Sequence, residues 1–111
     1  MIKYQRLSPL NREENVIPTV IQVNPRSDYK VYVYFSDGKI KLFDVSPFLN
    51  QGVFKQISSL DVFIEKCTVI NGTLAWDIGG NFDETKCLDL APETVYEKGV
   101  EVADPLSGLV A

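Results

Sequence analysis

The stretch Lys30–Asp44, KVYVYFSDGKIKLFD, decides the fold. Two runs rich in β-branched and aromatic residues flank Asp37-Gly38, a dipeptide that can supply the positive φ values of a two-residue hairpin turn. The stretch therefore predicts an antiparallel hairpin. Counting outward from the turn pairs Phe35 with Ile40, Val33 with Leu42 and Val31 with Asp44.

Cross-strand partners share a face of the sheet, so this register predicts one aliphatic and one aromatic face. We expect the aliphatic face to pack on the core. The opposite face would present Tyr32, Tyr34, Lys41 and Phe43, which is too aromatic for an ordinary solvated surface. Either the chain's own helices or tail cover this face, or it is an interface with another protein.

Upstream of the hairpin, Val16–Asn24 (VIPTVIQVN) is β-branched and is followed by Pro25, a pattern typical of a strand. Pro18 cannot donate a ladder hydrogen bond, so we predict that this strand lies at an edge of the sheet. Residues 1–15 are polar without a sustained period, and we interpret them as an N-terminal arm.

Downstream of the hairpin, a short helical turn is predicted to begin at Pro47, with Asp44 or Ser46 as its cap, and to end at Gly52. A helix of about two turns follows, because four apolar residues recur at helical spacing on one face. These residues are Leu60, Phe63, Ile64 and Cys67.

A second two-residue turn, Asn71-Gly72, predicts another hairpin. Counting outward places Val69 opposite Leu74 and, if strand pairing extends that far, Cys67 opposite Trp76, which directs Trp76 to the core.

The last part of the chain is predicted to hold Leu88 and Leu90, then a short helix that begins near Pro92 and ends at Gly99. The tail 100–111 is either an edge strand through Val100 and Val102 or loose.

Together these elements predict a single α+β domain. It consists of a small, mainly antiparallel β-sheet built from two hairpins and packed with two or three short helices. A length of 111 residues fits one domain. We assign 1–15 to the arm, 16–99 to the domain and 100–111 to a C-terminal tail.

Charge is unevenly distributed along the chain. Residues 1–76 carry nine Lys or Arg and seven Asp or Glu, a balance of +2, whereas residues 77–111 carry two and eight, a balance of −6. Binding to a phosphate backbone requires clustered cations, so direct nucleic-acid binding is not expected. A basic protein partner fits the acidic third better.

No residue pattern indicates catalysis. The chain has no His, the usual general base at neutral pH, and it lacks the glycine-rich motifs that bind phosphates. We therefore predict that it is not an enzyme and needs no cofactor. Cys67 and Cys87 form no CxxC pair, so zinc is not expected; they are either two buried thiols or a disulfide or redox pair.

An acidic group near the only Trp is the strongest alternative site. Its members are Asp77, Asp83, Glu84 and Asp89. Converging carboxylates could hold a hard cation or carry out acid–base chemistry. Their spacing does not match an EF-hand, and a solvated loop with capping carboxylates explains them more simply.

The sequence favours a cytoplasmic protein without membrane association. No apolar run approaches the roughly 18 residues that span a bilayer. The first residues, MIKYQR, begin neither a signal peptide nor a transit sequence.

The order of landmarks resembles the domain-of-unknown-function 2442 family of small bacterial proteins, over roughly residues 16–99. The motifs that carry the resemblance are FSDGKIKLFDVSPFL, GVFKQIS, a helix with Phe63, GTLAWDIGG and DLAPETVY. The resemblance implies a compact α+β fold without an assigned activity, so no functional residue can be transferred.

The same resemblance implies a role beside other small proteins, in toxin–antitoxin-like pairs. Some members are followed by a helix-turn-helix domain, for which the fifteen residues after Tyr96 are too few. Any action on DNA would therefore be expected to come through a partner.

Two hypotheses follow. The first is a non-enzymatic protein–protein interaction module, in its finer form the acidic, antitoxin-like half of a pair, with a homodimer as a further option. The second is a small-molecule or metal-binding protein that uses Asp77–Asp89. The candidate interaction residues are Tyr32, Tyr34, Phe43, Trp76, Asp77, Asp83, Glu84 and Asp89.

Overall fold

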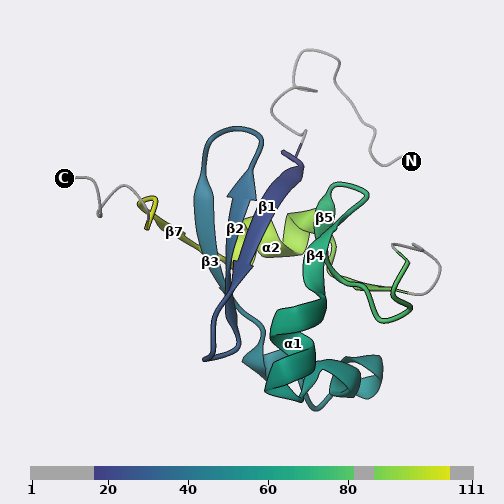
Figure 1. The fold of residues 1–111 in the computed structure, drawn as a ribbon. Coiled ribbons are helices and arrows are strands. Elements are labelled where there is room, and N and C mark those ends of the chain that lie inside the picture. Colours follow the sequence, from purple (N-terminus) through teal and green to yellow (C-terminus); the bar gives the residue numbers. More distant parts are fainter. Residues whose placement is uncertain (1–16, 82–86, 106–111) are drawn as a thin grey trace.

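Two antiparallel sheets form the framework of the protein in a computed structural model that describes residues 17–81 and 87–105 (Figure 1). The four-stranded sheet has the order β1-β2-β3-β7, and the three-stranded sheet has the order β4-β5-β6. The strands are β1 (Val20–Pro25), β2 (Lys30–Phe35), β3 (Ile40–Asp44), β4 (Cys67–Ile70), β5 (Thr73–Trp76), β6 (Leu88–Asp89) and β7 (Val100–Val102).

Short helices complete the α+β fold that the sequence predicts. The two α-helices are α1 (Leu60–Lys66) and α2 (Pro92–Lys98), and two 3-10 turns cover Ser46–Phe48 and Gly52–Ile57. Seven residues in each α-helix are too few to cross a bilayer, and the described residues contain no longer helix.

The hairpin of β2 and β3 exists, but its predicted register was wrong by one residue. The loop has three residues, 36–38, because only Gly38 has a positive φ, of 92°, and the Phe35 N–H donates to the Lys39 carbonyl oxygen at 2.9 Å. A one-residue shift turns the side chains of β3 to the opposite faces. The observed pairs are Lys30–Asp44, Val31–Phe43, Tyr32–Leu42, Val33–Lys41 and Tyr34–Ile40.

The hairpin of β4 and β5 confirms its predicted register. Asn71 and Gly72 both have positive φ, 57° and 76°, as a two-residue turn requires. Cys67 pairs with Trp76, and Val69 pairs with Leu74. The Trp76 indole is therefore directed into the core, where it is 0% exposed.

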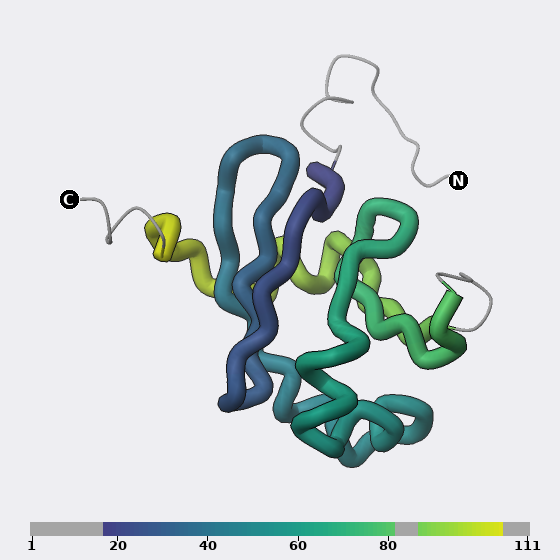
Figure 2. The backbone as a smooth tube through the Cα atoms, in the orientation of Figure 1, coloured from purple at the N-terminus to yellow at the C-terminus, as the bar shows by residue number. Residues whose placement is uncertain are grey.

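The two sheets share one hydrophobic core. β1 runs beside β4 (Figure 2), and the Val20 N–H donates to the Gly72 carbonyl oxygen at 2.9 Å. Both sheets and both helices contribute buried side chains to the same cluster. Its members are Val20, Val31, Val33, Phe35, Phe43, Val45, Ile57, Phe63, Leu74, Trp76, Leu90 and Val95.

The structure confirms some of the other predicted elements and contradicts others. β1 is an edge strand as predicted, but it begins at Val20 and not at Val16. α2 runs from Pro92 to Lys98 before Gly99, and Val100–Val102 of the predicted tail form the edge strand β7. Gly52 starts a second 3-10 turn instead of ending the first. The predicted apolar stripe of α1 was wrong at two positions: Ile64 is 41% exposed, and Cys67 belongs to β4, whereas Phe63 is buried. The predicted arm, residues 1–15, lies outside the described residues.

Candidate interaction surface

One face of the four-stranded sheet carries apolar side chains that do not belong to the core. Side chains alternate between the two faces of a strand, so the residues between the core positions of β2, β3 and β7 all project outward. None of them is part of the core cluster or packs against it. We call them the outer stripe: Tyr32, Tyr34, Ile40, Leu42, Val100 and Val102.

Both helices lie on the other side of the sheet. Tyr96 of α2 packs edge-on against Phe35, with ring centroids 4.9 Å apart, and Lys41 lies 4.7 Å from the Tyr96 ring centroid. Phe63 of α1 lies 5.0 Å from the Tyr29 ring, again in the core. The outer stripe is therefore covered by neither helix, and Val100 is 66% exposed.

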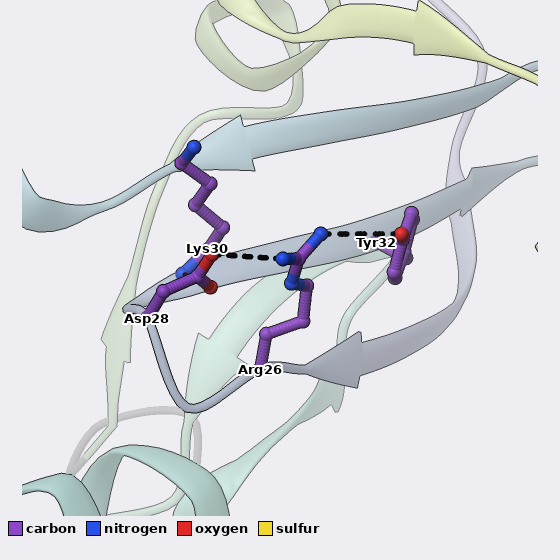
Figure 3. A network of polar contacts seen from close by, with 4 residues as sticks. All are labelled: Arg26, Asp28, Lys30 and Tyr32. Carbon is purple, nitrogen blue, oxygen red and sulfur yellow. Dashed lines mark hydrogen bonds and ion pairs between the residues drawn. The ribbon is translucent and has the colours of Figure 1, made fainter.

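A polar cluster borders the outer stripe at the Tyr32 end (Figure 3). The Arg26 guanidinium lies 5.6 Å from the Tyr32 ring centroid, and its Nη1 donates to the Tyr32 hydroxyl at 3.2 Å. Its Nη2 forms an ion pair with Asp28 Oδ2 at 2.9 Å. Asp28 also accepts the Lys30 N–H at 3.3 Å. The cluster thus holds Arg26 over the aromatic face, where a cation is favourable.

The Tyr34 end of the outer stripe has a different neighbour. The Tyr34 hydroxyl donates to Asp104 Oδ1 and accepts from Asn24 Nδ2, both at 3.5 Å. Burial, followed by the negative charge of Asp104, raises the pKa of Tyr34 above its ordinary value. This contact joins β2 to the segment that follows β7, although β3 lies between the two strands in the sheet.

The structure divides the aromatic residues singled out in the sequence into two groups. Tyr32 and Tyr34 lie on the outer stripe and are partly exposed. Phe43 and Trp76 lie in the core, 2% and 0% exposed. The Trp76 Nε1 donates to the Phe63 carbonyl oxygen at 3.1 Å. A partner could reach these two side chains only by opening the core.

Of the four acidic residues in the predicted alternative site, the structure describes two, Asp77 and Asp89. Asp77 is 8% exposed, and its Oδ1 accepts the Gly80 N–H at 3.0 Å, which closes the turn after β5. Asp89 is exposed on β6, opposite Ala75. Asp83 and Glu84 lie outside the described residues. Among those residues no group of three His, Cys, Asp or Glu could hold a metal ion.

The two cysteines lie on opposite sides of β5 and are not joined by a disulfide. Cys67 pairs with Trp76, whose other neighbour is Leu88, the residue after Cys87. Two strand spacings amount to about 10 Å, more than the roughly 7 Å that a disulfide spans between Cα atoms. Burial raises the pKa of the Cys67 thiol to about 12, so it stays protonated at neutral pH.

Sequence reasoning missed most members of this surface. Ile40 and Leu42 were assigned to the core because of the register error, whereas Val100 and Val102 carried a visible signal in the alternation of the tail. Arg26 and Asp104 carried no signal, because their contacts with Tyr32 and Tyr34 depend on the tertiary positions of a loop and of the segment after β7.

These features define a small α+β protein with an apolar outer sheet face. The chain belongs to the family described as protein of unknown function (DUF2442), whose model matches residues 20–101. That match confirms the resemblance seen in the sequence motifs. No curated protein and no solved structure matches the chain.

Proposed function

We propose that this chain is a non-enzymatic protein–protein interaction module that binds through the outer stripe. The observation that carries the proposal is the presence of six apolar side chains on a sheet face that neither helix covers. An antiparallel sheet with one solvated face normally alternates apolar and polar residues. Here β2, β3 and β7 carry apolar side chains on the outer face as well, which is typical of a surface that a partner covers.

The polar border supports the same proposal. Protein interfaces commonly have an apolar centre, rich in Tyr, and a polar rim that excludes water from it. Tyr32 and Tyr34 supply the aromatic centre, while Arg26, Asn24 and Asp104 supply rim contacts. Because hydrogen bonds hold the two tyrosines in place before binding, less conformational entropy is lost when a partner docks.

The finer form of the proposal is the antitoxin-like half of a pair with a basic partner. What supports it is the acidic surface of α2, where Glu93 and Glu97 are exposed and one helical turn apart. Like charges at this spacing destabilise a helix slightly, by a few tenths of a kcal/mol, and a cationic partner would remove that cost. A basic protein bound there would dissociate as salt screens the charges.

The test is affinity capture of the full chain from cells that produce it, at low salt and after a wash at about 0.5 M salt. Leu42→Asp places a charge in the outer stripe, and Val53→Asp, at a 59% exposed site on the second 3-10 turn, is the matched control. We expect wild type and V53D to retain the same stoichiometric partner after the salt wash and L42D to lose it.

Two results would contradict the proposal. One is that L42D retains, after the salt wash, every partner that wild type retains, provided that all three proteins show the same thermal unfolding midpoint. The other is the recovery of wild type without any partner, whether another protein or a second copy.

A further inference from the structure

We propose that the outer stripe binds a second copy of this chain, face to face, about a two-fold axis that lies between the two sheets. The axis runs at right angles to the strands and passes over β2 between Tyr32 and Tyr34. This inference rests on the proposed function, because it names an occupant for the same surface. It would make the protein a dimer with two packed four-stranded sheets, as in a β-sandwich.

The charges along β2 are self-complementary about this axis. Arg26 lies over Tyr32 at one end, and Asp104 lies beside the Tyr34 hydroxyl at the other. The two tyrosines are two residues apart, about 6.8 Å along the strand. A two-fold rotation exchanges the ends, so Arg26 of one copy faces Asp104 of the other, and this contact occurs twice.

The apolar side chains of β2, β3 and β7 also face apolar side chains of the second copy in this arrangement. The axis places Tyr32 of one copy over Tyr34 of the second, and it places β3 and β7 over the same strands of the second copy. Ile40 and Val102 then lie over Leu42 and Val100 of the second copy. Two such faces pack about 10 Å apart, which removes the exposed Val100 side chain from water.

The net charge of the rim also favours a second copy over a basic partner at this face. The charged residues around the outer stripe are nearly balanced, with two cations and three carboxylates. Most of the acidic residues of the segment 77–111 lie elsewhere. A surface with balanced charge suits a partner of the same composition. These residues are Arg26, Lys30, Asp28, Asp44 and Asp104.

The area of the outer sheet face determines how strongly the two copies are expected to bind. Four strands at about 4.8 Å spacing and five residues at about 3.4 Å give a face of roughly 320 Å² for each copy. The two faces together fall below the roughly 1,200 Å² of a standard interface. We therefore expect a reversible, concentration-dependent dimer that is already populated at micromolar to sub-millimolar protein.

A charge exchange across the axis tests the proposal by analytical ultracentrifugation of the full chain. Arg26→Glu alone and Asp104→Arg alone each create two repulsive contacts in a dimer, so each should dimerise at least tenfold more weakly than wild type. An equimolar mixture of R26E and D104R restores both contacts and should dimerise as wild type does. Lys55→Glu, an exposed charge reversal on the second 3-10 turn, should have no effect.

The comparison of L42D with V53D gives a second readout that leaves Arg26 and Asp104 intact. L42D should be monomeric, and V53D should dimerise as wild type does. A wild type that stays monomeric up to about 1 mM, or a mixture that fails to restore the dimer while R26E and D104R are both folded, would overturn the inference. If wild type is monomeric but L42D still loses a captured protein that V53D retains, the second copy is excluded and the proposed function stands.

Discussion

A single residue with positive φ determines each of the two three-residue hairpin loops. Gly38 has φ 92° at the third position of the loop 36–38, and Tyr29 has φ 65° at the same position of the loop 27–29. Equivalent pairs of backbone hydrogen bonds close the two loops. A tyrosine is unfavourable in this region of backbone space. It is retained here because its ring packs against Phe63 and its hydroxyl donates to the Ser58 carbonyl oxygen at 2.6 Å.

Gly38→Ala isolates the cost of the backbone conformation. A Cβ at this position would meet no atom within 4 Å, so only the positive φ opposes the substitution. We expect the free energy of unfolding to fall by about 1 kcal/mol, measured by urea denaturation. Ser27→Ala, at the first position of the other loop, should change it by less than about 0.5 kcal/mol. Equal stability of G38A and wild type would contradict this account.

The two Gly-containing turns show how far sequence predicts the elements. Asn71-Gly72 forms the predicted two-residue turn, because Asn tolerates the left-handed region. Asp37-Gly38 does not, because the Asp37 side chain accepts hydrogen bonds from the Lys39 N–H at 3.0 Å and from the Tyr96 hydroxyl at 2.7 Å. Tyr96 is 59 residues away in the chain, so a local pattern could not reveal this contact.

Dependence on distant contacts also limited the prediction of the outer stripe. Hairpins, helices and edge strands followed from local periodicity and turn residues, and Tyr32 and Tyr34 were identified without the structure. The one-residue register shift exchanged Phe43 with Ile40 and Leu42 between the faces. Predicting the rest of the surface required the tertiary position of β7, which the sequence left open between a strand and a loose tail.

Trp76 joins β5 to α1, and its replacement should weaken that junction. Trp76→Phe removes the Nε1 donor to the Phe63 carbonyl oxygen and leaves unfilled volume beside a ring whose centroid lies 5.7 Å away. We expect a loss of about 2 kcal/mol in the free energy of unfolding by urea denaturation. Ile64→Val, on the exposed side of α1, should cost little. A W76F protein as stable as I64V would show that the junction contributes no stability.

At the scale of the whole molecule, the two sheets should unfold together. They contribute to one core cluster, and β1 is hydrogen-bonded to the turn between β4 and β5. Trp76, the only tryptophan, reports on the three-stranded sheet, whereas far-ultraviolet circular dichroism reports on all the secondary structure. We expect the two signals to give the same urea midpoint, as a two-state transition requires. Separate midpoints would show that the sheets are independent folding units.

The position of β7 in the chain affects when the outer stripe becomes complete. β3 ends at Asp44 and β7 begins at Val100, and the whole three-stranded sheet and α2 lie between them in the sequence. A chain made from its N-terminus on the ribosome therefore exposes the open edge of β3 until the later elements emerge. A nascent chain lacks Val100, Val102 and Asp104, so it cannot present the complete surface to a second copy. In the proposed dimer, self-association would therefore be restricted to molecules whose synthesis has passed β7 and whose last strand has docked.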